Sequence, residues 1–119
     1  MTKTNYELRY AAHPDDARHY TSDRLRHDFL IGKIFSPNEV NMVYSMYDRM
    51  IVGGAMPVEE KLHLEAIDPL KQPIFLHSRE LGIFNIGGVG KVHVADKSFD
   101  LSYKEALYLG AGDREVYFE

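Results

Sequence analysis

Histidines and carboxylates are the side chains of this sequence that could bind a metal ion or exchange protons. The chain has six histidines, which are His13, His19, His27, His63, His77 and His93. A zinc ion needs three or four converging ligands, and the histidines form neither a His-x-His nor a His-Glu-x-x-His pattern. We therefore expect no metal site within this chain. The alternative is an unorthodox metal site assembled from His63, Glu65, His77, Glu80 and Glu115.

Two arginines stand next to apolar, β-rich stretches. Arg49 follows Asp48 inside the run 40–57, and Arg79 precedes Glu80 and a second apolar run. A charge beside Ile, Val and Leu is costly to bury unless it is paired, so structural ion pairs are one explanation. The other is that the guanidinium fork binds the carboxylate of a substrate or partner. Arg49 and Arg79 are the predicted substrate-binding residues, and no catalytic residue is assigned.

The composition indicates a soluble globular protein with one domain. The chain has 119 residues, of which 45% are hydrophobic and 27% charged. A net charge of −4 argues against nucleic acid as a partner, because a phosphate-backbone binder needs a basic face. Without cysteines the chain forms no disulfide. Neither a membrane span nor an apolar targeting segment is visible, so we expect no membrane association and a cytoplasmic location.

Glycine-interrupted β-rich runs indicate an antiparallel barrel or sandwich in most of the chain. The run 40–57 is too long for one strand, so we expect a bend at Asp48-Arg49 or at Gly53-Gly54. The alternation in 58–67 predicts an amphipathic strand. A hairpin is predicted from 91–94 and 98–101, with Val92, Val94, Phe99 and Leu101 on one side.

The first third of the chain has a different character. It is polar and mixed, and it predicts one short helix that begins near Pro14 and a second that begins at Thr21 or Ser22. We therefore divide the chain into an N-terminal helical arm, residues 1–33, and a β-domain, residues 34–119.

The glycine-rich run Gly87-Gly88-Val89-Gly90 resembles a phosphate-binding loop only superficially. It lacks the Lys-Ser/Thr of a P-loop and leads into a predicted strand rather than a helix. We expect a tight turn with positive φ.

The β-rich part resembles a cupin, a small β-barrel, with its metal chemistry largely removed. Glu80 and Gly87 keep the spacing that ends the first cupin motif, but the positions of the preceding His-x-His pair hold the apolar Ile74 and Leu76. In the second motif, Glu115 stands where a metal-binding histidine would be. The resemblance implies an all-β fold, a cupin-like barrel or jelly roll with short N-terminal helices. The β-domain would be the degenerate N-terminal cupin of a bicupin, a protein with two cupin domains. This N-terminal cupin need not be complete in the chain.

Three runs resemble the N-terminal half of the bacterial 4-deoxy-L-threo-5-hexosulose-uronate ketol-isomerases, also called 5-keto-4-deoxyuronate isomerases. The runs are Leu25–Leu30, Met42–Ser45 with Asp48–Pro57, and Arg79–Gly82 with Asn85–Gly88. The resemblance implies part of an aldose–ketose type isomerase. That enzyme interconverts 5-dehydro-4-deoxy-D-glucuronate and 3-deoxy-D-glycero-2,5-hexodiulosonate in pectin and uronate degradation.

The family resemblance also implies a cofactor and partners. Zinc is expected in the full-length family, on ligands in the C-terminal half, and none is expected in this chain. The implied partners are a small-molecule sugar acid and further copies of the chain, since the family forms hexamers. We therefore expect the 119-residue chain to be structural, inactive alone and self-associating. The alternative is a non-catalytic sugar-acid binding or oligomerisation module of cupin fold.

Overall fold

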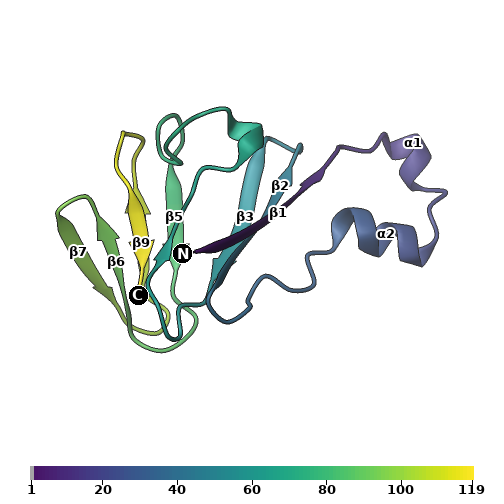
Figure 1. The fold of residues 1–119 in the computed structure, drawn as a ribbon. Helices are drawn as coiled ribbons and strands as arrows, with labels where there is room; N and C mark the ends of the chain where they lie inside the picture. Colours follow the sequence, from purple (N-terminus) through teal and green to yellow (C-terminus); the bar gives the residue numbers. More distant parts are fainter. Residues whose placement is uncertain (1) are drawn as a thin grey trace.

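The fold is built mainly from β-strands, as the sequence predicts. A computed structural model describes residues 2–119 (Figure 1). In chain order the elements are β1 (Lys3–Arg9), α1 (Pro14–Ala17), α2 (Ser22–Phe29), β2 (Glu39–Ser45), β3 (Met50–Ala55), β4 (Leu62–His63), the 3₁₀ turn η1 (Asp68–Leu70), β5 (Leu81–Phe84), β6 (Gly90–Val94), β7 (Lys97–Leu101), β8 (Ala106–Leu109) and β9 (Val116–Phe118).

The strands form three sheets that enclose one apolar core. Their strand orders are β1-β2-β3, β4-β9-β6-β7 and β5-β8. The all-β, cupin-like fold is therefore confirmed, although the three sheets are not joined into one closed barrel within residues 2–119. The core cluster consists of Val40, Met42, Tyr44, Leu62, Leu64, Ile67, Phe75, Leu76, Val92, Val94, Leu101, Leu109 and Val116. No helix in the described part of the chain is long and apolar enough to cross a membrane.

Strand β1 departs from the predicted helical arm over 1–33. It pairs in parallel with β2 and so belongs to a sheet. Its residues Tyr6 and Leu8 stand in register with the buried Met42 and Tyr44. The polar residues that alternate with them hide this strand in the sequence, because one side of an edge strand is solvated. Residue 1 lies outside the described residues, and the domain boundary after residue 33 stays a prediction.

The two predicted helices are confirmed, and each has a side-chain cap at its start. His13 Nδ1 accepts a hydrogen bond from the Asp15 amide over 3.1 Å and caps α1. Thr21 Oγ1 accepts from the Arg24 amide over 3.3 Å and caps α2. Neither helix buries a residue. Figure 1 shows the pair projecting away from the three sheets.

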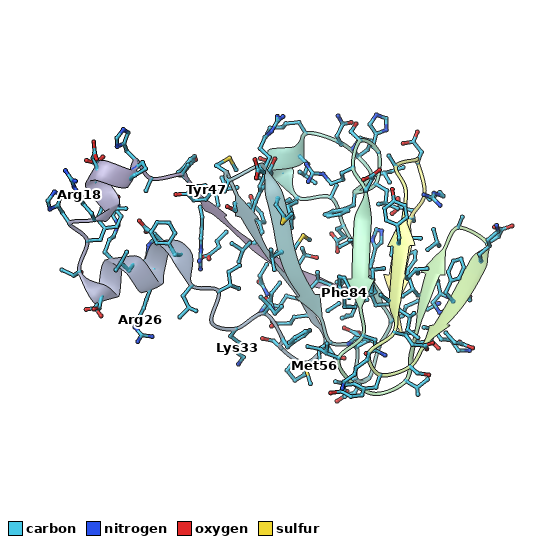
Figure 2. The ribbon with its side chains drawn as sticks, turned by 180° about the vertical axis from the view of Figure 1, so that it is seen from behind. Arg18, Arg26, Lys33, Tyr47, Met56 and Phe84 are labelled. Carbon is cyan, nitrogen blue, oxygen red and sulfur yellow. The ribbon has the colours of Figure 1, made fainter. Side chains whose placement is uncertain are left out.

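Hydrogen bonds hold the base of this projecting pair of helices. The Arg9 guanidinium donates to the Leu30 carbonyl over 2.6 Å. The Tyr47 hydroxyl accepts from the Ala12 amide over 2.9 Å. Figure 2 places Tyr47 where the helical pair leaves the sheets and Arg26 farther out, on α2. Besides these polar contacts, the ring of Phe29 lies 6.3 Å from that of Tyr47, and Leu25 and Phe29 remain 40% and 47% exposed.

Turns fall partly where the sequence predicts them. The predicted bend at Asp48-Arg49 is confirmed: both residues are left-handed, with φ of 56° and 49°, between β2 and β3. Gly53 and Gly54 lie inside β3 instead. The β6–β7 hairpin is confirmed, and its left-handed residue is Ala95, with φ of 53°.

Strand β4 is shorter than the sequence predicts. Of the alternating run 58–67, only two residues pair as a strand. Leu62 and Leu64 are nevertheless both buried, as the alternation predicts. The segment therefore keeps its buried side, but only its central part pairs with β9.

The glycine-rich run at 87–90 is not the positive-φ turn that we predicted. Among the described glycines only Gly112 has positive φ. The side chain of Asn85 organises this loop instead. Its Oδ1 accepts from the Gly87 amide over 2.9 Å, and its Nδ2 donates to the carbonyls of Gly88 and Leu101.

Candidate functional site

The place of the first cupin motif is occupied by apolar core. Leu76, at one of the two histidine positions of that motif, is fully buried with 0% exposure. Its neighbour Phe75 is buried as well, and Ile74 is half-buried. These side chains offer no donor atom to a metal ion. The interior at this point can stabilise the fold but cannot bind a cation.

Glu115, at the second cupin motif, faces away from that interior. Its neighbour Val116 is buried at 1% exposure, and side chains alternate between the two faces of the chain here. The Glu115 carboxylate lies 2.5 Å from His63 Nε2. This carboxylate–imidazole pair is therefore on the outer side of the sheet.

The outer face of the β4-β9-β6-β7 sheet carries a row of aromatic and imidazole rings. Tyr117 stands in register with His63 on one side and His93 on the other. The rings of His63 and Tyr117 are stacked with centroids 4.6 Å apart. On the far side, His93 bonds Ser98 at 2.7 Å and Glu119 at 3.0 Å. Strand register thus brings together residues from distant parts of the chain.

A shallow hollow adjoins this row of rings. It is lined by Thr2, Lys61, His63, Glu65 and Tyr117. Lys61 Nζ is 3.8 Å from a Glu119 oxygen, so its charge already has a partner. The additional carboxylates of Glu65 and Glu115 make this surface unfavourable for an anion.

The five residues of the alternative metal site do not converge. His63 pairs with Glu115, while Glu65 accepts a 3.4 Å hydrogen bond from Thr4. His77 instead pairs with Asp113 at 2.5 Å. Across residues 2–119, no three His, Cys, Asp or Glu side chains form a group that could hold a metal ion. The structure does not bring the five residues of this alternative into one site, because His77 and Glu80 have other partners than the group of His63, Glu65 and Glu115.

Glu80 has a different partner, the hydroxyl of Tyr108. Tyr108 is 64% exposed, on β8. The hydrogen bond to Glu80 raises the pKa of the Tyr108 hydroxyl, with partial burial and the charge of Glu80 as smaller causes. Glu80 is therefore engaged in a local polar pair rather than in a metal site.

The two predicted substrate-binding arginines lie in different surroundings. Arg49 is exposed in the β2–β3 turn. The Arg79 side chain is half-buried. Its guanidinium carbon is 5.6 Å from the ring centre of Tyr44 and 5.9 Å from that of Phe75. Both rings belong to the core cluster, so the core itself holds Arg79 in place.

Sequence reasoning found Arg79 but missed the rings that hold it. Tyr44 and Phe75 are 31 residues apart in the chain, and nothing in their spacing shows that they meet at one guanidinium. It also missed Tyr117 and Lys61. The alternation of residues 115, 117 and 119 could have shown that these three share one face of a strand. It could not have shown which strands lie beside that strand.

Fold and site together define an all-β, cupin-like domain whose first motif position is apolar. No protein-family model matches the chain. Individual relatives do. The chain is 72% identical over 117 residues to the 4-deoxy-L-threo-5-hexosulose-uronate ketol-isomerase of Bacteroides fragilis, covering 98% of this chain and 42% of the relative.

Two further relatives carry the same name. Ketol-isomerase 1 of Bacteroides thetaiotaomicron is 70% identical with the same coverage. The protein of Lachnoclostridium phytofermentans is 47% identical over 112 residues, which are 94% of this chain and 41% of the relative. The chain is thus closely similar to these uronate ketol-isomerases over nearly its whole length and spans about two fifths of theirs. The resemblance found in the sequence is confirmed.

Proposed function

We propose that this chain is the part of a uronate ketol-isomerase that provides fold and assembly rather than the reacting groups. The 72% identity over nearly the whole chain supports the assignment to this enzyme. The reaction proposed for the complete enzyme interconverts 5-dehydro-4-deoxy-D-glucuronate and 3-deoxy-D-glycero-2,5-hexodiulosonate. Pectin and uronate degradation is the corresponding proposed process, in the cytoplasm.

The chemistry of that reaction explains why this chain alone should be inactive. A ketol isomerisation moves a proton between the carbons that flank a carbonyl, so it needs a general base and a group that stabilises the enediolate. Zinc is the proposed electrophile of the complete enzyme, and it requires at least three protein ligands. The side chains of residues 2–119 do not fit such an ion, because no three ligand groups converge. We place the zinc ligands in the remaining part of the longer protein.

Uncovered apolar side chains support a role in assembly. Phe84 on β5 is 76% exposed and Tyr108 on the paired strand β8 is 64% exposed. On the projecting helix α2, Leu25 and Phe29 are 40% and 47% exposed. Burying one such side chain stabilises a contact by roughly 1.5–3 kcal/mol. We therefore propose that the chain forms homo-oligomers.

Three measurements on the purified 119-residue chain test this proposal. We expect no bound zinc by elemental analysis, no isomerase turnover, and self-association by size exclusion with light scattering. Stoichiometric zinc together with turnover would show that the reacting groups are in this chain. A monomer at all micromolar concentrations would refute the role in assembly.

The second candidate function is a sugar-acid binding module without catalysis. The observation that favours it is the half-buried Arg79, whose guanidinium lies against two core rings. Saturable binding of a uronate by the chain, without turnover, would support this function. Absence of binding would remove it.

A further inference from the structure

The guanidinium of Arg79 is fixed in position by aromatic contacts. It lies against the rings of Tyr44 and Phe75, at 5.6 and 5.9 Å. Tyr44 is 7% and Phe75 is 6% exposed, so neither ring can move freely. Contact between a guanidinium and aromatic rings offsets part of the cost of its burial. It does not use the N–H donors, which lie in the plane of the group.

Those donors have no protein partner among residues 2–119. No carboxylate lies within ion-pair distance of Arg79, and no acceptor within hydrogen-bond distance. Glu80, the acid next to Arg79 in the sequence, is hydrogen-bonded to Tyr108, and Asp113 pairs with His77. Arg79 therefore combines a fixed position with free donors.

Other arginines of the chain do not share this combination. Arg9 and Arg24 are paired with the carboxylates of Glu7 and Asp28. Arg49 is exposed at a turn, where water can satisfy its donors. Holding a partly desolvated guanidinium in a fixed orientation, without an acid, favours the binding of a carboxylate from outside.

We propose that Arg79 binds the carboxylate of a sugar acid, and that Tyr44 and Phe75 hold its guanidinium in the orientation for binding. This inference rests on the proposed function, which supplies a uronate as the class of ligand. The inference distinguishes Arg79 from Arg49, the other predicted substrate-binding residue, because Arg49 is exposed at a turn. The inference also distinguishes Arg79 from the hollow beside Tyr117, where Lys61 and His63 are already paired with Glu119 and Glu115 and Glu65 adds a further negative charge.

The test compares D-galacturonate with neutral D-galactose, each titrated into the 119-residue chain and followed by NMR and calorimetry. The two sugars differ at C6, so a difference between them reports carboxylate recognition. We expect saturable binding of galacturonate and none of galactose. Arg79→Gln should weaken galacturonate binding by about tenfold or more, because a charge-assisted hydrogen bond contributes roughly 1.5–3 kcal/mol.

Two further variants make the result specific. Arg49→Gln, the matched control at the exposed turn, should bind galacturonate like the wild type. Arg79→Lys keeps the positive charge but loses the planar guanidinium that can bind both carboxylate oxygens. We expect its affinity for galacturonate to lie between those of the wild type and Arg79→Gln. Circular dichroism and thermal unfolding of each variant show whether the fold is kept. If Arg79→Gln does not fold, Arg79→Lys decides, since equal affinity for wild type and Arg79→Lys would contradict bidentate recognition.

Several outcomes would overturn the inference. They are no saturable binding of galacturonate to the wild type, equal binding of galactose, or undiminished binding by a folded Arg79→Gln. A weakened self-association of Arg79→Gln with unchanged sugar binding would show that a protein carboxylate is the partner. None of these readouts depends on isomerase turnover, so failure of this inference and failure of the proposed enzyme can be told apart.

Discussion

Gly54 should tolerate substitution by alanine much less well than Gly88 does. Gly54 is buried in β3, and the segment that follows the helices crosses directly over it. A Cβ atom at Gly54 would lie 2.8 Å from the Ile34 carbonyl oxygen and 2.9 Å from two ring atoms of Phe35. Asn41 Nδ2 donates to that same carbonyl over 3.0 Å, so the carbonyl cannot move without loss.

The expected magnitude follows from these distances. The contact with the Ile34 oxygen would be about 0.6 Å short of the 3.4 Å at which ordinary contact begins. Relieving such overpacking typically costs about 1–3 kcal/mol. At about 4 °C per kcal/mol for a chain of this size, Gly54→Ala should lower Tm by roughly 4–12 °C relative to its control.

Gly88→Ala is the matched control. No atom lies within 4 Å of a Cβ at Gly88, and this glycine does not have positive φ. Both substitutions reduce the conformational entropy of the unfolded chain, which is worth about 0.4–1 kcal/mol. That effect cancels in the comparison and leaves the steric term at Gly54. Thermal and urea unfolding by circular dichroism measure it, and agreement of the two variants within about 0.5 kcal/mol would refute the close approach.

Three further predictions concern the core and two polar pairs. Leu76→Ala should destabilise the chain by about 2–5 kcal/mol in urea unfolding, because Leu76 is 0% exposed; a loss below about 1 kcal/mol would contradict its place in the core. Glu80→Gln should lower the pKa of Tyr108 towards its ordinary value, seen as an earlier rise of phenolate absorbance, because the Glu80 carboxylate raises that pKa; an unchanged titration would exclude the pair. The hydrogen bond from Lys3, at 2.8 Å, lowers the pKa of Glu39, so this pair stabilises the fold above the ordinary carboxyl pKa and the effect is lost as pH falls through the lowered one. Glu39→Gln should therefore reduce the acid dependence of Tm, and an identical pH profile would show that the pair contributes nothing.

Residue alternation, together with the residue types that begin or end helices and strands, was enough to predict much of the local structure. The β6–β7 hairpin, the turn at Asp48-Arg49 and both helix starts follow from short-range rules, which act over a few residues and need no partner. Strand β1 was missed because it is an edge strand, and only its pairing with β2 makes it a strand. The loop at 87–90 was misjudged because one side chain, that of Asn85, replaces the expected glycine conformation.

The sequence by itself determined the all-β class, the resemblance to the uronate ketol-isomerases and the apolar residues at the cupin histidine positions, because residue types and their spacing carry these properties. Only the tertiary structure decided which side chains meet. It separated His63 and Glu115 from His77 and Glu80, and it placed Arg79 against two core rings from distant segments. The physical reason is that strand pairing and core packing bring together residues far apart in the chain, and local spacing does not encode those contacts.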